Sequence, residues 1–343
     1  MGRSYREAGV DIDEAKRAVE LIGRAAAATA TPAVLGGVGG FGSLFRFDPS
    51  AHPDPVLVAS TDGVGTKLKV ALGMGRLDTI GVDLVNHCIN DIAVQGADPL
   101  FFLDYLAVAK LRAEMAAEIV GGIASACAAA GVALVGGETA ELPDLYAGED
   151  FDLAGFIVGV VARADVIDGS AVRAGDALIG LPSSGLHTNG YSLARRIFGE
   201  EDWRRSAPGL SGSIGEALLV PHRSYLDEIR ILRRSLREAG GDTLAFAHIT
   251  GGGWVDNIPR TLPAGLGVEV DAGSWQIPLI FSLIQERGDV SDEEMVRTFN
   301  LGIGLTCAIR PELVAIALRA LPEARRVGTV VTVDPGAQRV TFV

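Results

Sequence analysis

Basic residues are scarce in this chain, and the balance of charge limits its partners. Lys and Arg together number 30 against 43 Asp and Glu, so the formal net charge is -13. A protein that holds nucleic acid neutralises many phosphates with surplus Lys and Arg, so this charge argues against a nucleic-acid partner. An anionic ligand needs positive charge supplied locally, by a metal ion, by backbone N–H groups or by a single Lys.

Cysteines, histidines and signal-like apolar runs are also few. Cys88, Cys127 and Cys307 lie far apart with no CxxC pair, so we expect free thiols, a reducing compartment and a cytoplasmic location. The five His show no zinc-ligand spacing. The first ten residues lack an apolar signal region, and we expect Gly or charge to interrupt every apolar stretch before 18 residues. The sequence therefore predicts no membrane partner.

Composition and length favour a two-domain globular protein. Hydrophobic residues make up 48% and charged residues 21% of the 343 residues. Short apolar runs alternate with longer helical patterns, which is typical of an α/β or α+β fold. The polar segment 164–175 reads as a linker, and we place the boundary there, giving domains 1–168 and 169–343.

The expected elements follow from these patterns. In the first half we expect strands over 55–60, 100–108, 133–136 and 151–161 and helices over 78–95 and 112–131. In the second half we expect strands over 176–181, 244–249, 267–270, 302–309 and 327–333 and helices over 190–198, 225–239, 277–285, 292–298 and 311–321.

A glycine-rich segment matches the G-x-G-x-x-G pattern over 37–42, with Asp62 about twenty residues beyond. The prolines at 49, 53 and 55 forbid the helix that a dinucleotide-binding loop requires. Two interpretations stay open for Gly39, Gly40 and Gly42: a loop whose N–H groups wrap phosphate oxygens, or a simple mobile loop.

Segment 60–67 combines a carboxylate, a hydroxyl and an ammonium with two glycines. It is not a Walker A loop, because the spacing is wrong. We favour a metal-bound phosphate site at Asp62, Gly63, Thr66 and Lys67 over a tight turn with a surface Lys.

The predicted helix 78–95 carries an apolar stripe and, beside it, a polar band. Residues four apart share a helix face, so Asp83, His87 and Asp91 align, with Asn86 and Asn90 alongside. Short Asp and Asn side chains are poor helix formers and good oxygen ligands, so we favour Mg²⁺ or phosphate coordination over an exposed face without a role.

Three further segments place polar groups at the ends of strands. After the strand at 133–136, Glu138 and Thr139 are either an ordinary helix entry or ligands of a metal or ribose, and the pattern does not choose. Segment 182–191 collects hydroxyls, an imidazole and an amide, which favours an anion or amide site. Segment 250–253 places three glycines between a strand and a helix, which favours a phosphate cradle.

Taken together, these segments resemble the phosphoribosylformylglycinamidine cyclo-ligase family, in order and with the family's spacing. The residues that carry the resemblance lie at 36–42, 60–67, 90–91, 94–97, 101–105, 135–141, 182–192 and 247–253. The resemblance implies two α/β domains, the second an α/β sandwich, and a homodimer in which the N-terminal sheets of both subunits form a β-barrel. It also implies Mg²⁺- and ATP-dependent closure of formylglycinamidine ribonucleotide to aminoimidazole ribonucleotide.

The resemblance also implies roles for single residues. Asp62, Asp91 and Glu138 would hold the metal, and ATP would lie near Gly39, Gly40, Gly42, Asp62, Gly63, Thr66, Lys67, Asn90, Glu138 and Thr139. Ser183, Ser184, His187, Asn189, Thr250, Gly251, Gly252 and Gly253 would bind the ribonucleotide. Asp62, Lys67, His187 and His248 are the expected catalytic groups, and the two His are the candidates for proton transfer.

Two alternatives remain at this stage. One is another ATP enzyme of the same superfamily, namely a selenophosphate synthetase, a thiamine-phosphate kinase or a hydrogenase-maturation dehydratase. A reactive Cys in the glycine loop or at residues 339–343 is expected of the first and the last, and neither segment contains one. The second alternative is a module that binds nucleotide without turnover.

Overall fold

The computed structural model describes residues 9–36 and 39–343, which form two compact units. Unit 1 comprises residues 1–92 and 97–163, as far as they are described, and unit 2 comprises residues 93–96 and 164–343. Positions 37 and 38 of the glycine motif lie outside the described residues. Each unit has its own sheet.

Unit 1 is built on a four-stranded sheet of order β1-β4-β2-β3. Its elements are α1 (Ile12–Ala27), β1 (Pro55–Gly63), α2 (Lys67–Met74), α3 (Ile80–Ala93), β2 (Asp98–Val108), α4 (Ala113–Ala130), β3 (Ala133–Glu141) and β4 (Phe151–Ala162), with a short 3-10 turn at Pro49–Ala51. β4 runs antiparallel to β1 and β2, and β2 runs parallel to β3.

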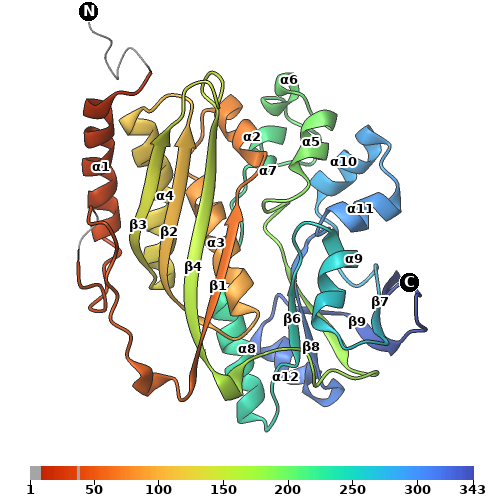
Figure 1. Ribbon diagram of the computed structural model, residues 1–343. Coiled ribbons are helices and arrows are strands. Elements are labelled where there is room, and N and C mark those ends of the chain that lie inside the picture. Colours follow the sequence, from red (N-terminus) through yellow and green to blue (C-terminus); the bar gives the residue numbers. More distant parts are fainter. Residues whose placement is uncertain (1–8, 37–38) are drawn as a thin grey trace, which may run out of the picture. The chain divides into compact units, whose positions relative to one another are not determined.

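One face of this sheet is covered and the other is open. In Figure 1, α3 and α4 lie behind the four strands, while no described helix crosses the face toward the viewer. On that open face Leu57 is 64% exposed and Phe156 is 44% exposed, and the pairing of Thr61 with Phe156 places both on the same side. Large apolar side chains on this face of the sheet are thus exposed to solvent.

Helix α4 is long and apolar, although Glu114, Glu118, Gly121 and Gly122 interrupt its apolar residues as expected. It is 18 residues long with a mean hydropathy of 1.3, so by length and composition this one helix among the described residues is apolar enough to cross a membrane. However, 56% of it is buried inside the unit, with Met115, Ile119 and Ile123 among its buried residues. That burial is typical of the core helix of a globular domain, which passes the same test.

Glycines let α3 and α4 cross at close range. A Cβ on Gly122 would lie 2.4 Å from the carbonyl oxygen of Asp78, and a Cβ on Gly81 would lie 2.3 Å from that of Ile119. Any side chain at either position therefore forces the two backbones apart. The close crossing holds α3 against the sheet.

Unit 2 is built on a six-stranded sheet of order β10-β7-β9-β5-β8-β6. The strands are β5 (Ala177–Pro182), β6 (Ala245–His248), β7 (Leu266–Val270), β8 (Ile303–Ile309), β9 (Arg325–Thr332) and β10 (Val340–Phe342). The helices are α5 (Tyr191–Ile197), α6 (Glu200–Trp203), α7 (Ile214–Leu218), α8 (Leu226–Glu238), α9 (Gly253–Asn257), α10 (Leu279–Gly288), α11 (Asp292–Thr298) and α12 (Val314–Ala320). Only the β10–β7 pair is parallel.

The core of unit 2 lies against this sheet and explains its strand pattern. Trp254, Val268, Ile303 and Val327 are all buried in one apolar cluster. Trp254 stacks on Trp275 with ring centroids 5.3 Å apart. β8 is buried at every position, as expected of a central strand covered on both faces.

The strands and helices predicted from sequence are confirmed, with differences in length and in number. β1 and β3 run further than expected, to Gly63 and Glu141, so Asp62 and Glu138 lie within strands rather than after them. The elements α1, α2, α6, α7 and β10 were not predicted. The expected free thiols are confirmed, because all three cysteines are unpaired and buried.

Adjacent glycines of α4 offer a matched test of the helix crossing. Gly122→Ala should lower the free energy of unfolding by about 1–3 kcal/mol, because its Cβ overlaps the backbone of α3. Gly121→Ala should instead raise it by up to about 1 kcal/mol, because Gly121 has open space around it and Ala favours helix. Urea unfolding of both variants measures the difference; equal effects would contradict the crossing.

Candidate functional site

The end of β1 and the last two turns of α3 bring two predicted ligands, Asp62 and Asp91, close to one histidine. His87 Nε2 lies 2.8 Å from Asp62 Oδ2 and 3.8 Å from Asp91 Oδ2, and the Ser60 hydroxyl donates to Asp91 at 3.1 Å. Asp62 also accepts the backbone N–H of Gly63 at 2.7 Å. The Asp62 side chain is 41% exposed and that of Asp91 26%, so both carboxylates remain open to a ligand from solution.

The electrostatics of this cluster favour its charged forms. Burial alone would lower the pKa of His87, but the hydrogen bond to Asp62 and the negative charge of Asp91 outweigh it, so the pKa is raised. Burial alone would raise the pKa of Asp62, yet the hydrogen bond and charge of His87 lower it overall. The contact between His87 and Asp62 therefore favours the charged form of both groups.

Lys67 is placed differently from the expectation. It begins α2, is fully buried, and its Nζ lies 2.8 Å from Asp83 Oδ1, which is also fully buried. Burial lowers the pKa of Lys67, and the charge of Asp83 opposes this shift. The polar band of α3 therefore turns inward at Asp83, His87 and Asn90, and Lys67 contacts Asp83 rather than a solvent-accessible phosphate site.

Glu138 does not join Asp62 and Asp91. Strand pairing aligns Asp62 with Gly155, Gly155 with Asp104, and Asp104 with Gly137. Side chains alternate along a strand, so Glu138 projects from the opposite face of the sheet to Asp62, three strand spacings or roughly 14 Å away. The predicted set of three carboxylates is thus not assembled within this chain.

Glu138 and Thr139 instead line a separate cavity at the β3 edge. This cavity of about 220 Å³ lies between β3 and α1, and its other lining residues are Val19, Ile22, Ala26, Asp104, Leu134, Gly136 and Gly137. The glycine loop is anchored beside it, because the Ser43 hydroxyl donates to the carbonyl oxygen of Val135 and Phe45 packs on Phe101 at 5.1 Å. Gly39, Gly40 and Gly42 are described and precede this anchor.

Asp104 also lines this cavity; it lies in segment 101–105, which carries part of the resemblance, but it was not predicted as a site residue. It is 6% exposed, and burial raises its pKa to about 7. Its carboxylate packs against Gly137, where a Cβ would lie 2.4 Å from Oδ1. A buried carboxyl that titrates near neutral pH is a common feature of functional sites.

In unit 2, the loop after β5 is held by a network of hydrogen bonds. The Ser183 hydroxyl donates to Asn300 Oδ1 at 3.0 Å, and Asn300 Nδ2 donates to the Gly185 carbonyl at 2.9 Å. His187 adopts a left-handed backbone with φ of 61°, and its Nε2 accepts the backbone N–H of Ser184 at 3.2 Å. A strained residue at such a place is typical of functional loops.

The 250–253 loop lies next to Asn189. A Cβ on Gly251 would be 3.3 Å from Asn189 Oδ1, so the two predicted substrate segments are neighbours. Asn257 Nδ2 donates to the carbonyls of Thr250, Gly251 and Gly253. Gly252 and Gly253 have φ of 91° and 55°, which only glycine adopts readily.

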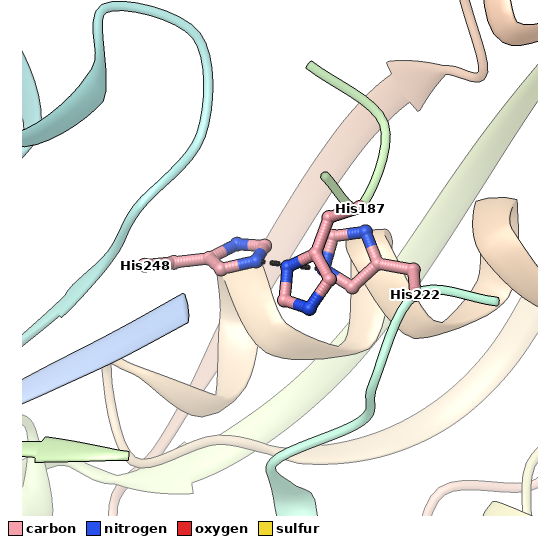
Figure 2. A group of neighbouring side chains, drawn as sticks. All are labelled: His187, His222 and His248. Atoms are coloured by element: carbon pink, nitrogen blue, oxygen red, sulfur yellow. Dashed lines mark hydrogen bonds between the residues drawn. The ribbon is translucent and has the colours of Figure 1, made fainter. Parts of the chain in front are cut away.

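Three imidazoles meet beneath these loops, as Figure 2 shows. His187 stacks on His222 with ring centroids 3.9 Å apart, and His222 Nε2 lies 3.0 Å from His248 Nε2. His222, Asn257 and Asn300 were not predicted as site residues. No local motif marks His222 and Asn300, because each contacts a distant segment of the chain, whereas Asn257 bonds the glycine loop just before it.

Both units match models of known domains. Residues 43–161 match the N-terminal domain, and residues 173–339 the C-terminal domain, of AIR synthase related proteins. By fold and by these matches the chain is an AIR synthase related protein of two α/β domains.

Curated relatives narrow this class. The phosphoribosylformylglycinamidine cyclo-ligase of Desulfitobacterium hafniense is 55% identical over 312 residues, which cover 91% of this chain and 91% of the relative. That of Geotalea daltonii is 49% identical over 350 residues, covering 99% and 98%. The chain belongs to the phosphoribosylformylglycinamidine cyclo-ligase family.

Solved structures share the fold at lower identity. The hydrogenase maturation protein HypE of E. coli aligns with a TM-score of 0.66 and 21% identity over 94% of this chain and 93% of that chain. A thiamine-monophosphate kinase from Stenotrophomonas maltophilia aligns with a TM-score of 0.63 and 20% identity over 94% and 95%. These likenesses concern the fold alone.

The raised pKa of Asp104 predicts a pH-dependent stability. Between about pH 4 and 7 the folded chain holds a proton on Asp104 that the unfolded chain releases, so this residue makes unfolding easier as pH rises through that window. Asp104→Asn keeps the shape without the charge. It should raise the thermal midpoint moderately at pH 5 and more at pH 8, because the wild type loses stability progressively across that window, by a total on the order of a few kcal/mol.

Thermal unfolding of wild type and Asp104→Asn from pH 5 to 8 measures this difference. Asp152→Asn, an exposed position on the neighbouring strand β4, serves as the control and should shift nothing with pH. If the difference in thermal midpoint between wild type and Asp104→Asn does not grow from pH 5 to 8, then Asp104 ionises in the folded chain without loss of stability.

Proposed function

We propose that this chain closes formylglycinamidine ribonucleotide to 5-aminoimidazole ribonucleotide at the expense of ATP, releasing ADP and phosphate, as a ligase of de novo purine biosynthesis. The observation that carries this proposal is the likeness to cyclo-ligases at 49–55% identity over at least 91% of the chain. The site geometry in each unit supports it, because unit 1 offers oxygen ligands and unit 2 offers neutral polar donors.

The chemistry asks the protein mainly to position groups and to neutralise charge. The formamide oxygen of the substrate takes the γ-phosphoryl group of ATP, and ADP leaves. The neighbouring amidine nitrogen then attacks the same carbon, the C–N bond of the ring forms, and the C–O bond breaks with loss of phosphate. A nitrogen-bound proton is removed in that step, for which a neutral imidazole is suited.

Unit 1 makes up most of the proposed nucleotide and dimerisation domain, which spans 1–168. Asp62 and Asp91 fit Mg²⁺, because carboxylate oxygens are its preferred ligands and both carboxylates reach solvent. The ion would supply the positive charge that a chain of net charge -13 lacks around a triphosphate. A HypE relative in fold was solved in complex with ATP, which supports a nucleotide at this fold.

The other proposed ATP contacts fall into two groups. Gly63, Thr66 and Asn90 lie with Asp62 around β1 and α3, whereas Glu138, Thr139 and the loop of Gly39, Gly40 and Gly42 lie around β3. Lys67 does not contact the ligand in this arrangement; its ion pair with Asp83 of α3 helps to hold the first group in place. We therefore assign Lys67 to positioning α3 and leave direct phosphate contact to Mg²⁺ and backbone N–H groups.

Unit 2 contains the proposed substrate domain, which spans 169–343. The loop of Ser183, Ser184, His187 and Asn189 adjoins the loop of Thr250, Gly251, Gly252 and Gly253, and together they would hold the ribonucleotide. Glycine backbone N–H groups suit its 5′-phosphate. His187 and His248 are the proposed groups for proton transfer.

The open face of the unit 1 sheet supports a homodimer. Exposed Leu57 and Phe156 give that face an apolar surface that a soluble monomer rarely shows over a regular sheet. Two four-stranded sheets that bury these faces against each other can close into a barrel, which also removes the exposed edges of β1 and β3. Dimerisation through this sheet would therefore both bury the apolar face and pair the exposed strand edges.

Product analysis tests the proposed reaction directly. Purified protein with ATP, Mg²⁺ and formylglycinamidine ribonucleotide should form the aminoimidazole ribonucleotide and ADP in equal amounts. Asp91→Asn should lower kcat by at least about 100-fold, because it removes a ligand to the ion that neutralises the transferred phosphoryl group. Turnover is followed by the colour reaction of the aminoimidazole and by ADP release.

The control is Asp152→Asn, an exposed carboxylate of the same unit, which should retain turnover. ADP release with a phosphorylated acyclic product would indicate a kinase instead. ATP binding without ADP release would indicate a binding module. Wild-type-like turnover of Asp91→Asn would remove the metal assignment alone.

The dimer has its own test. Phe156→Asp places a charge at the centre of the proposed interface and should convert the dimer into a monomer, as measured by sedimentation velocity. Val166→Asp, at an exposed apolar position in unit 2, should leave the dimer intact. If the folded Phe156→Asp variant remains a dimer, the interface lies elsewhere.

A further inference from the structure

Unit 2 contains a cluster of buried imidazoles that the proposed reaction uses only in part. His187 follows β5, His222 lies between α7 and α8, and His248 ends β6. They are 0%, 1% and 6% exposed. Figure 2 shows the three rings converging from separate segments of chain. Three histidines buried together are unusual, because each must satisfy its ring nitrogens.

The geometry of the cluster is close to that of a metal site. Each residue offers a ring nitrogen, and these nitrogens all lie within 4.8 Å of one another. The closest pair, His222 Nε2 and His248 Nε2, is 3.0 Å apart. Three nitrogens at 2.0–2.1 Å from a tetrahedral Zn²⁺ are about 3.3 Å from each other, so small rotations of the rings suffice to bind an ion.

The surroundings hold the rings in place, as at known metal sites. Thr188 Oγ1 lies 3.4 Å from His222 Nδ1, and the ring of His187 is held by its stacking on His222. Gly304 of β8 leaves the space that His187 fills, since a Cβ there would lie 2.5 Å from Cε1 of that ring. The strained backbone of His187 is thus fixed with its ring in the cluster.

The donor set selects the kind of ion. Neutral imidazoles suit Zn²⁺, Co²⁺, Ni²⁺ and Cu²⁺, whereas Mg²⁺ requires oxygen ligands and gives up its water reluctantly. The three-nitrogen group contains no carboxylate. Three protein nitrogens leave a fourth position of a tetrahedral ion for water or hydroxide, which lowers the cost of burying the charge.

We propose that His187, His222 and His248 form a site for a zinc-class divalent ion, and that its occupation inhibits the enzyme. The inhibition follows because the ion takes up nitrogens of His187 and His248, which lie in the proposed substrate segments. This second part rests on the proposed function, whereas ion binding does not. The sequence, read by ligand spacing, indicated no zinc site, because the three residues come together only in the fold.

Co²⁺ binding to the full-length protein, stripped of metal and kept in excess Mg²⁺, tests the site. Mg²⁺ occupies the carboxylates, and buried thiols do not compete, because burial raises the pKa of all three cysteines. We expect one Co²⁺ per chain, with the intense visible absorption of a tetrahedral nitrogen-bound ion, displaced by Zn²⁺. His222→Phe and His222→Gln should each weaken binding by at least about 100-fold.

His52→Gln is the matched control, because His52 lies outside the cluster in unit 1 and should bind Co²⁺ as the wild type does. Two variants at His222 guard against loss of fold, since Phe keeps the stacking and Gln keeps a hydrogen-bonding end. Absence of the visible bands in the wild type, or equal binding by a folded His222 variant, would overturn the site.

Turnover measured beside binding separates the two parts of the proposal. Zn²⁺ should inhibit wild type and His52→Gln at the concentrations that displace Co²⁺, and His222→Phe should need at least about 100-fold more. Full activity of the Zn²⁺-loaded wild type would overturn the inhibition and leave the site standing. If the protein binds Co²⁺ but forms no product even when Zn²⁺ is absent, the proposed reaction is overturned and the site stands.

Discussion

A charged side chain can be buried only if an opposite charge accompanies it, and in unit 1 this requirement fixes the relation of α2 to α3. Lys67 and Asp83 are both fully buried and 2.8 Å apart. Withdrawing each from water costs several kcal/mol, so either one alone would be strongly destabilising. Because Lys67 begins α2, the pair also fixes the turn that follows β1, and with it the place of Asp62 opposite Asp91.

The sequence could predict that the polar residues of α3 share one face, but not which way that face points. A helical period gives the angle between side chains and leaves the rotation of the helix about its axis open. Packing sets the rotation of α3 about its axis. Gly81 and Gly122 allow α3 to pack closely on α4, and Asp83, His87 and Asn90 are buried as a result. Similarly, pairing with β2 carries β3 through Gly136 and Gly137, although glycine disfavours strands.

The candidate site was predictable where a local motif contains the ligand residues, and less predictable where residues from distant segments come together only in the fold. Asp62 and Asp91 come together as expected of a metal pair. Glu138 does not, because the register of four strands places it on the other face, and a register cannot be read from isolated motifs. The partners of His187 were hidden for the same reason: His222 and His248 are 26 residues apart and meet through tertiary contacts alone.

The two units offer different ligands for metal ions, because each fold brings different side chains together. In unit 1, Asp62 and Asp91 supply carboxylate oxygens, which suit Mg²⁺. His87 lies beside both, and the hydrogen bond to Asp62 and the charge of Asp91 raise the pKa of its ring. A proton competes with a metal ion for a ring nitrogen, so these carboxylates favour their own oxygens over that nitrogen as ligands. In unit 2 the three-histidine group offers three imidazole nitrogens and no carboxylate, so its chemistry suits a zinc-class ion.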